Sequence, residues 1–152
     1  MDGPLAETQV RENIFVWTLG GETLHTSYGT NCTAVIGPDA VLVVDPLVAP
    51  AHARLVAAAI REKTAAPVRF VVLTHHHTDH SVGASVFTQD GAVLIAHRAC
   101  RERMATEHPQ LLVQRREAAD SRELFADAVS MLPTVTLDES LTVHLGEQEI
   151  EL

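Results

Sequence analysis

Cysteine, aromatic residues and long apolar runs are scarce in this sequence of 152 residues. The two cysteines, Cys32 and Cys100, are far apart and form no Cys-x-x-Cys pair, so neither a disulfide framework nor a thiolate zinc site is indicated. We expect both to be small core residues. Aromatic residues make up only 4% of the chain, so its core must be built from Val, Leu, Ile and Ala. With 46% hydrophobic and 20% charged residues, we treat residues 1–152 as a single domain.

Membranes and nucleic acids are not expected among the partners. No apolar stretch approaches the roughly 20 residues needed to span a bilayer, and the segment 1–9 is too polar for a signal peptide. We therefore expect a cytoplasmic protein. Its 20 acidic residues outnumber 11 basic ones, which gives a net charge of −9. Binding to a phosphate backbone requires clustered Lys and Arg, so nucleic-acid binding is disfavoured.

Histidine, by contrast, is concentrated at one place. Four of the nine histidines fall within residues 75–80, directly after the apolar run 68–73. That run is short, rich in β-branched residues and preceded by Pro67, which predicts a buried strand. The polar cluster therefore follows the end of a strand, where side chains are held by the sheet yet reach solvent.

The spacing of this cluster predicts a metal site. His75 and His77 are two residues apart, so in extended backbone they share one side, while His76 has the opposite parity. Asp79 and His80 follow where the chain should turn toward a helix. Imidazole and carboxylate ligands suit zinc, or iron or manganese, better than calcium. The candidate metal ligands are therefore His75, His77, Asp79 and His80.

The His-x-His-x-Asp-His pattern resembles that of the metallo-β-lactamase-fold hydrolases. The resemblance covers residues 30–100 well, including Asp45 at the end of an earlier strand and Gly83 after the motif. It implies an α/β fold: the N-terminal half of an αββα sandwich, a mixed sheet covered by helices. It also implies that Asp45 supports the metal loop, although Asp45 accepting only backbone hydrogen bonds is an equal alternative. Gly83 either lets the backbone approach that loop or is a simple packing glycine.

The remaining elements are predicted from periodicity and turn residues. Residues 22–29 form either a flap near the site or an ordinary surface turn. A helix is expected over 50–64, and a short one over 82–87 with Ser81 as its cap. A helical region over 97–131 is expected to be split by Pro109. Strands are expected at 10–19, at 31–36 and 40–44 as a hairpin, at 92–96, and as short antiparallel strands at 134–137, 141–145 and 147–152.

Several ligands of a complete dinuclear site, as the resemblance implies it, are missing. Such a site also uses a histidine in a Gly-His-Thr-like turn, a bridging aspartate and a last histidine from the second half of the sandwich. After His80 the chain offers only His97, His108 and His144, none of them in such a turn. We therefore expect a single domain, apparently truncated before the second half of the fold.

The resemblance implies a metal-dependent hydrolase acting on an ester, thioester or lactam through a metal-activated hydroxide. The cofactor would be zinc, with one or two ions in the parent fold, or alternatively iron or manganese. Asp79 is the candidate catalytic residue, as a metal ligand or as the group that orients the nucleophile. His77 occupies a position that is typically Glu in the flavin-linked di-iron branch, which is therefore disfavoured.

Two hypotheses about the chain itself follow. As half of a hydrolase with a small-molecule substrate, it would be inactive alone, because part of the ligand set is absent. As a non-catalytic metal-binding or assembly module, it would retain the half-fold for assembly. In both cases an uncovered apolar sheet face would favour a homodimer, or pairing with a missing C-terminal half.

Overall fold

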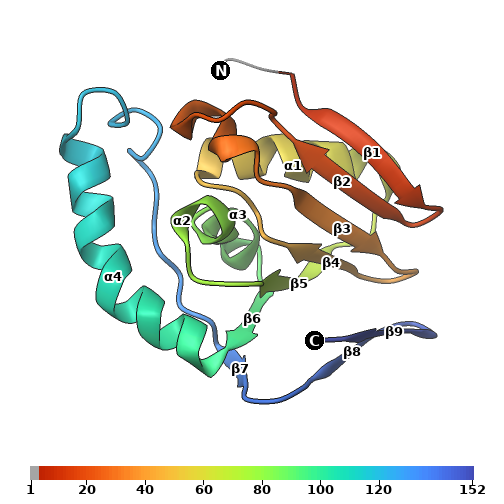
Figure 1. The fold of residues 1–152 in the computed structure, drawn as a ribbon. Coiled ribbons are helices and arrows are strands. Elements are labelled where there is room, and N and C mark those ends of the chain that lie inside the picture. The colour runs from red at the N-terminus through yellow and green to blue at the C-terminus, as the bar shows by residue number, and fades with distance from the viewer. Residues whose placement is uncertain (1–3) are drawn as a thin grey trace.

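A mixed seven-stranded sheet forms the centre of the protein in the computed structural model, which describes residues 4–152 (Figure 1). The strands follow one another in chain order across the sheet. The first four pair antiparallel, whereas the fourth to the seventh pair parallel. The strands are β1 (Ala6–Arg11), β2 (Ile14–Thr18), β3 (Cys32–Ile36), β4 (Val41–Val44), β5 (Val68–Leu73), β6 (Val93–His97) and β7 (Val135–Leu137).

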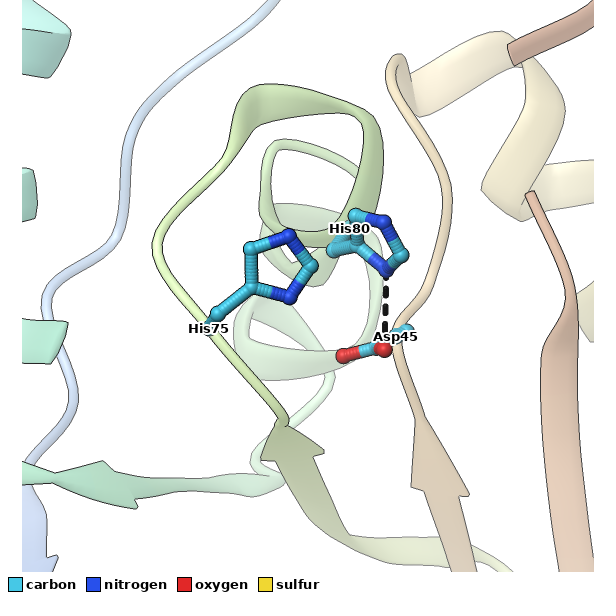
Figure 2. A group of neighbouring side chains, drawn as sticks. All are labelled: Asp45, His75 and His80. Carbon is cyan, nitrogen blue, oxygen red and sulfur yellow. Dashed lines mark hydrogen bonds and ion pairs between the residues drawn. The ribbon is translucent and has the colours of Figure 1, made fainter. Parts of the chain in front are cut away.

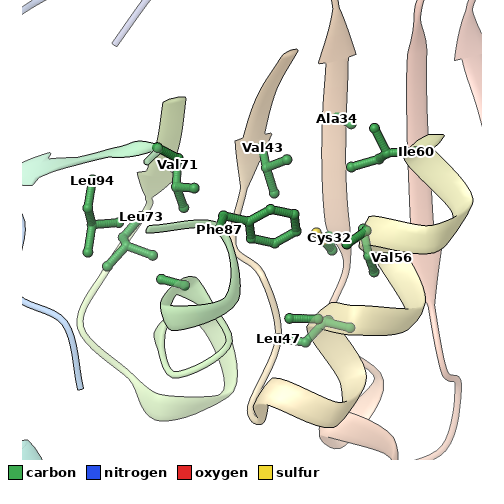
Figure 3. Close-up of a cluster of buried hydrophobic side chains, with 14 of the residues drawn as sticks. Cys32, Ala34, Val43, Leu47, Val56, Ile60, Val71, Leu73, Phe87 and Leu94 are labelled. Atoms are coloured by element: carbon green, nitrogen blue, oxygen red, sulfur yellow. The ribbon is translucent and has the colours of Figure 1, made fainter. Parts of the chain in front are cut away.

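Helices cover one face of this sheet. The main core lies between the sheet and helices α1, α3 and α4, and Figure 3 shows Phe87 of α3 reaching in between the strands and α1. In the strands, alternate residues such as Val41 and Val43 point to this face, as the two-residue period of a strand requires. The helical elements are η1 (Leu24–Gly29), α1 (Pro50–Lys63), α2 (Thr78–Ser81), α3 (Ala84–Gln89) and α4 (Arg98–Glu117).

The other face of the sheet carries a separate two-stranded hairpin, β8 (Thr142–Leu145) and β9 (Gln148–Glu151). Val143 and Leu145 of this hairpin pack on the intervening strand positions, among them Leu42 and Val72. Leu145 lies so close to Gly37 that a Cβ there would approach it to 2.7 Å. The apolar face predicted to be open is thus covered in part by the hairpin.

The predicted α/β class and the mixed sheet covered by helices are confirmed. The hairpin over 31–36 and 40–44, the helix over 50–64 and the strand at 92–96 are each found within one or two residues. Part of the predicted polar N-terminal segment, residues 1–3, lies outside the described residues. In residues 4–152, no helix has both the length and the apolarity that crossing a membrane requires.

Several local predictions are wrong. The single strand expected at 10–19 is two strands, because the chain turns at Glu12 and Asn13 and β1 pairs with β2. Pro109 does not split the helical region: α4 continues through it. Ser81 does not cap the next helix but ends α2, where its hydroxyl donates to the His77 carbonyl at 2.8 Å.

The antiparallel direction predicted for the strand at 134–137 is also wrong. β7 pairs parallel to β6. The chain after α4 runs back beside that helix, so β7 begins at the same end of the sheet as β6 (Figure 1). The two cysteines are core residues as predicted, and burial raises the pKa of the Cys100 thiol to about 11.

Replacing Leu145 should reveal whether the hairpin is part of the folded unit. Leu145 is 2% exposed, so Leu145→Ala removes buried methyl groups and should lower the free energy of unfolding by about 2 kcal/mol or more. Urea denaturation followed by circular dichroism measures this loss. His144→Ala, on the same strand but exposed, is the matched control and should change it little. Equal effects would mean that the hairpin does not dock in solution.

Candidate metal centre

The histidine-rich segment lies at the carboxyl edge of two parallel strands. β4 ends at Val44 and β5 ends at Leu73, so Asp45 and residues 74–80 emerge side by side at one edge of the sheet. The main chain joins them directly, because the Asp45 amide donates to the Val72 carbonyl at 3.0 Å. Crevices at the carboxyl ends of parallel strands are the usual ligand sites of open α/β sheets.

The loop after β4 has an unusual backbone. Asp45 and Leu47 both have positive φ, 54° and 69°, a region that few residues other than glycine adopt. The loop is fixed by Leu47 donating to the Asp45 carbonyl at 2.9 Å and by Gly83 donating to the Leu47 carbonyl at 3.0 Å. A Cβ at Gly83 would lie 1.8 Å from the Pro46 carbonyl oxygen, so only glycine fits. Gly83 therefore lets the backbone pack closely, but its partner is the loop after β4 and not the histidine-rich segment 75–80 that one interpretation predicted.

Asp45 is the centre of the hydrogen-bond network. Asp45 is 6% exposed, and its carboxylate accepts from the Thr74 amide at 2.9 Å and the Thr74 hydroxyl at 2.6 Å. The Nδ1 atom of His80 donates to the same carboxylate at 2.9 Å, as Figure 2 shows. Asp45 thus orients a histidine of the motif, as the resemblance implies, and the alternative that it accepts only backbone hydrogen bonds is wrong.

Three side chains converge here. Asp45, His75 and His80 each offer an oxygen or nitrogen atom, and these atoms all lie within 4.8 Å of one another (Figure 2). The rings of His75 and His80 are adjacent, with centroids 4.1 Å apart and their planes tilted by 53°. Imidazole and carboxylate donors in this arrangement form a candidate metal-binding group.

Asp79 and His77 flank this trio. Asp79 places its Oδ2 atom 3.2 Å from Nε2 of His80, and the Thr30 hydroxyl donates to the same oxygen at 2.9 Å. His77 is exposed, and its ring centroid is 4.7 Å from that of His75. Neither residue is tested as a metal ligand by this geometry, so both assignments stay predictions.

The extended backbone expected for this segment is wrong, because the chain bends over residues 74–76. His76 nevertheless leaves the cluster as its parity predicted. Its Nε2 atom lies 3.3 Å from Glu107 on α4. His97, at the end of β6, accepts from the Ala99 amide and caps α4.

The local electrostatics differ between the two central histidines. Burial lowers the pKa of His75, and the nearby His80 and His77 lower it further. For His80 burial also lowers the pKa, but the hydrogen bond and charge of Asp45, with the charge of Asp79, outweigh it and raise the pKa above its ordinary value. The site therefore holds one histidine that favours its neutral form and one that is paired with carboxylates.

Some residues of the site are not apparent from the sequence. Thr30 is separated from Asp79 by 49 residues, and His108 is separated from its partner His76 by 32. Thr74 is the exception, because its place between a buried strand and the motif could have marked it as a partner for Asp45.

The fold and the donor groups together define an α/β protein with a candidate metal centre at the edge of its sheet. Residues 25–151 match the family model of the metallo-beta-lactamase superfamily. The match covers most of the chain, which therefore belongs to the metallo-beta-lactamase superfamily. No curated protein matches the chain.

Solved structures show the same fold. A metallo-beta-lactamase from Pontibacter korlensis is similar with a TM-score of 0.73 and 18% identity over 97% of this chain and 59% of that one. The metallo-beta-lactamase FIM-1 from Pseudomonas aeruginosa, in a mono-zinc form, is similar with a TM-score of 0.68 and 16% identity, over 93% and 55%. The chain thus spans less than two thirds of the length of these structures.

The contact of Gly83 with Pro46 yields a prediction for the loop after β4. Gly83→Ala should lower the free energy of unfolding by about 3 kcal/mol or more, the upper end of overpacking costs, because the new methyl group overlaps a carbonyl oxygen. Gly91→Ala is the control: no atom lies within 4 Å, so only its left-handed backbone is strained, at about 1–2 kcal/mol. Urea denaturation compares the two, and an equal or smaller loss at Gly83 would contradict the close approach.

Proposed function

We propose that this chain provides the metal-binding half of a metal-dependent hydrolase acting on a small ester, thioester or lactam. The observation that carries the proposal is the convergence of Asp45, His75 and His80 at the strand edge of a metallo-beta-lactamase superfamily fold. The substrate would be a small molecule. Both similar structures are named metallo-beta-lactamases, which favours a lactam over an ester or a thioester as the substrate.

The donor atoms fit a metal such as zinc. Nδ1 of His75 is 3.0 Å from the Thr74 hydroxyl, and Nδ1 of His80 binds Asp45. The Nε2 atom of each ring is therefore the nitrogen that would coordinate a metal ion. Partners of this kind orient ligating histidines in metal sites. The 3.2 Å between Nε2 of His80 and Asp79 is near the spacing of about 3.3 Å for two ligands on one zinc. We assign His75 and His77 to one ion, and Asp79 and His80 to a second.

Each side chain then has a distinct role. A bound zinc ion polarises a carbonyl or ester oxygen and lowers the pKa of a coordinated water to about 7. Asp79 is the proposed catalytic residue, because its carboxylate, held by Thr30, can accept a proton or orient the attacking water. Asp45 accepts from Nδ1 of His80 and so holds the tautomer whose Nε2 atom can coordinate a metal ion.

The activity would need more than the described residues. Because the chain spans 59% and 55% of the two similar structures, we propose that further ligands complete the site in the active protein. By itself this chain should bind one zinc ion or less and be inactive or feeble. Metal binding with no hydrolysis in the complete protein would favour the alternative, a non-catalytic metal-binding or assembly module.

Zinc retention tests the ligand assignment. His75→Ala and His77→Ala should each lose most bound zinc, since each removes a donor and leaves the other ligand less constrained. His76→Ala is the matched control and should lose far less zinc than either, because its side chain lies toward Glu107 and is not a proposed ligand. Elemental analysis after dialysis against a weak chelator gives the zinc content per chain.

Two results would contradict the proposal. Equal zinc loss in all three variants would contradict the assignment of His75 and His77 as metal ligands. Hydrolysis of a chromogenic ester, thioester or β-lactam by the zinc-treated protein that survives His75→Ala or chelation would show that the activity does not use this site.

The sheet face beside the β8–β9 hairpin supports a proposal about assembly. Ile14, Val44, Phe70 and Val93 on this face are only partly buried. We propose that a second copy of the chain covers them in a symmetric homodimer. Pairing with the remaining half of the fold is the competing arrangement.

Sedimentation velocity at micromolar concentration should therefore give a dimer, because pairing removes this apolar surface from water. Phe70→Glu should shift the sedimentation coefficient to that of a monomer, whereas Arg69→Glu, at the exposed neighbouring position, should not. A wild-type protein that stays monomeric without aggregating would rule out the homodimer.

A further inference from the structure

His108 on α4 is a buried histidine with two polar partners from distant segments. It is 1% exposed, and both ring nitrogens are engaged. Nε2 lies 2.6 Å from the His76 carbonyl oxygen, and Nδ1 lies 2.6 Å from the Ser130 hydroxyl. Since both nitrogens are used, His108 is not free to serve as a metal ligand in this arrangement.

The partners determine where the proton of the ring lies. A carbonyl oxygen can only accept, so Nε2 must carry hydrogen and donate to His76. Burial lowers the pKa of His108, which favours the neutral ring. Nδ1 then accepts from the Ser130 hydroxyl, and this contact holds the ring in the tautomer that donates to His76.

His76 is the residue through which this contact reaches the candidate metal centre. It stands between His75 and His77, and its carbonyl belongs to the peptide group that joins it to His77. Ser81 donates to the next carbonyl, that of His77, at 2.8 Å. The consecutive carbonyl groups of His76 and His77 are therefore both held by side chains.

α4 holds His76 by its side chain as well. Glu107, the residue before His108, lies 3.3 Å from Nε2 of His76 and is itself paired with Arg103 at 2.9 Å. Successive residues of one helix thus contact the imidazole and the carbonyl of a single residue of the loop.

The position of Ser130 is also fixed. The chain returns along α4 after residue 117 (Figure 1), and Arg116 donates to the carbonyls of Phe125 and Ala128. Phe125 and Ala128 are buried in a small apolar cluster with Leu112. The hydroxyl that orients His108 is therefore supplied by a segment packed firmly on the same helix.

We propose that His108 is a positioning residue for the metal loop: with Ser130 behind it, it holds the His76 peptide so that His75 and His77 point to a common place. The inference rests on the proposed metal site, but the contact also orders the loop without metal. It assigns a role in metal affinity to α4 and the 118–134 connection, which contribute none of the proposed ligands His75, His77, Asp79 and His80.

Three variants separate positioning from general stability. His108→Leu removes both hydrogen bonds at similar size, and His108→Gln retains an amide donor for the His76 carbonyl. Ser130→Ala leaves the His108 ring in place but removes the hydroxyl that holds it in the tautomer with hydrogen on Nε2. His144→Leu, at an exposed histidine, is the control. Two measurements are made on each: Co²⁺ affinity with the visible absorption of bound cobalt, and amide hydrogen exchange of the metal-free protein at residues 74–80.

His108→Leu should weaken Co²⁺ binding at least about tenfold, as loss of a residue that orients metal ligands typically does, and change the cobalt spectrum. It should also speed exchange at residues 74–80 more than in the strands. His108→Gln should recover most of both properties, and Ser130→Ala should give an intermediate loss.

Unchanged exchange and cobalt affinity in His108→Leu would overturn the inference, as would a His108→Gln protein as impaired as His108→Leu. If His108→Leu does not fold, the comparison of Ser130→Ala and His108→Gln with wild type decides the outcome by the same criteria. A wild-type protein that takes up no cobalt would contradict the proposed function, and the exchange rates would still decide whether His108 holds the loop.

Discussion

The buried carboxylate of Asp45 is the interaction on which the site depends. A charge that is 6% exposed is costly unless it is paired and hydrogen-bonded, so its partners must be held in place. Two come from Thr74 at the end of the neighbouring strand and one from His80. The left-handed turn after Asp45 and the close approach of Gly83 are the backbone conditions that allow this.

Two segments that contribute no ligand to the trio hold the loop of residues 74–80 in place. The first is η1 and the residue after it: Ser27 donates to the Asp79 carbonyl and Thr30 to the Asp79 carboxylate. α4 holds His76 through His108. Beneath them, an apolar cluster joins η1, the loop after β4, α2–α3 and α4. Pre-organisation of this kind lowers the cost of bringing ligands to one ion, which is why a site on loops can still be specific.

The errors in the predicted fold have physical causes. Pro109 lacks a backbone amide and costs roughly 3 kcal/mol inside a helix, yet α4 continues because Met104, His108 and Leu112 on either side are buried against the protein. That packing is invisible in a local pattern. The direction of β7 likewise follows from the return of residues 118–134 along α4, a tertiary path that strand periodicity does not contain.

The sequence by itself determined two things: the strands that flank the site, and the superfamily to which the chain belongs. Both follow from local properties of the chain, namely β-strand periodicity and the spacing of residues 75–80. It also placed Asp45 and Gly83 beside the motif. Only the tertiary structure decided which donors meet: the bend at 74–76 separates His76 from His75, and Asp45 reaches His80 across two strands. Thr30 and His108 act on the loop from 49 and 32 residues away, since hydrogen bonds depend on proximity in space and not along the chain.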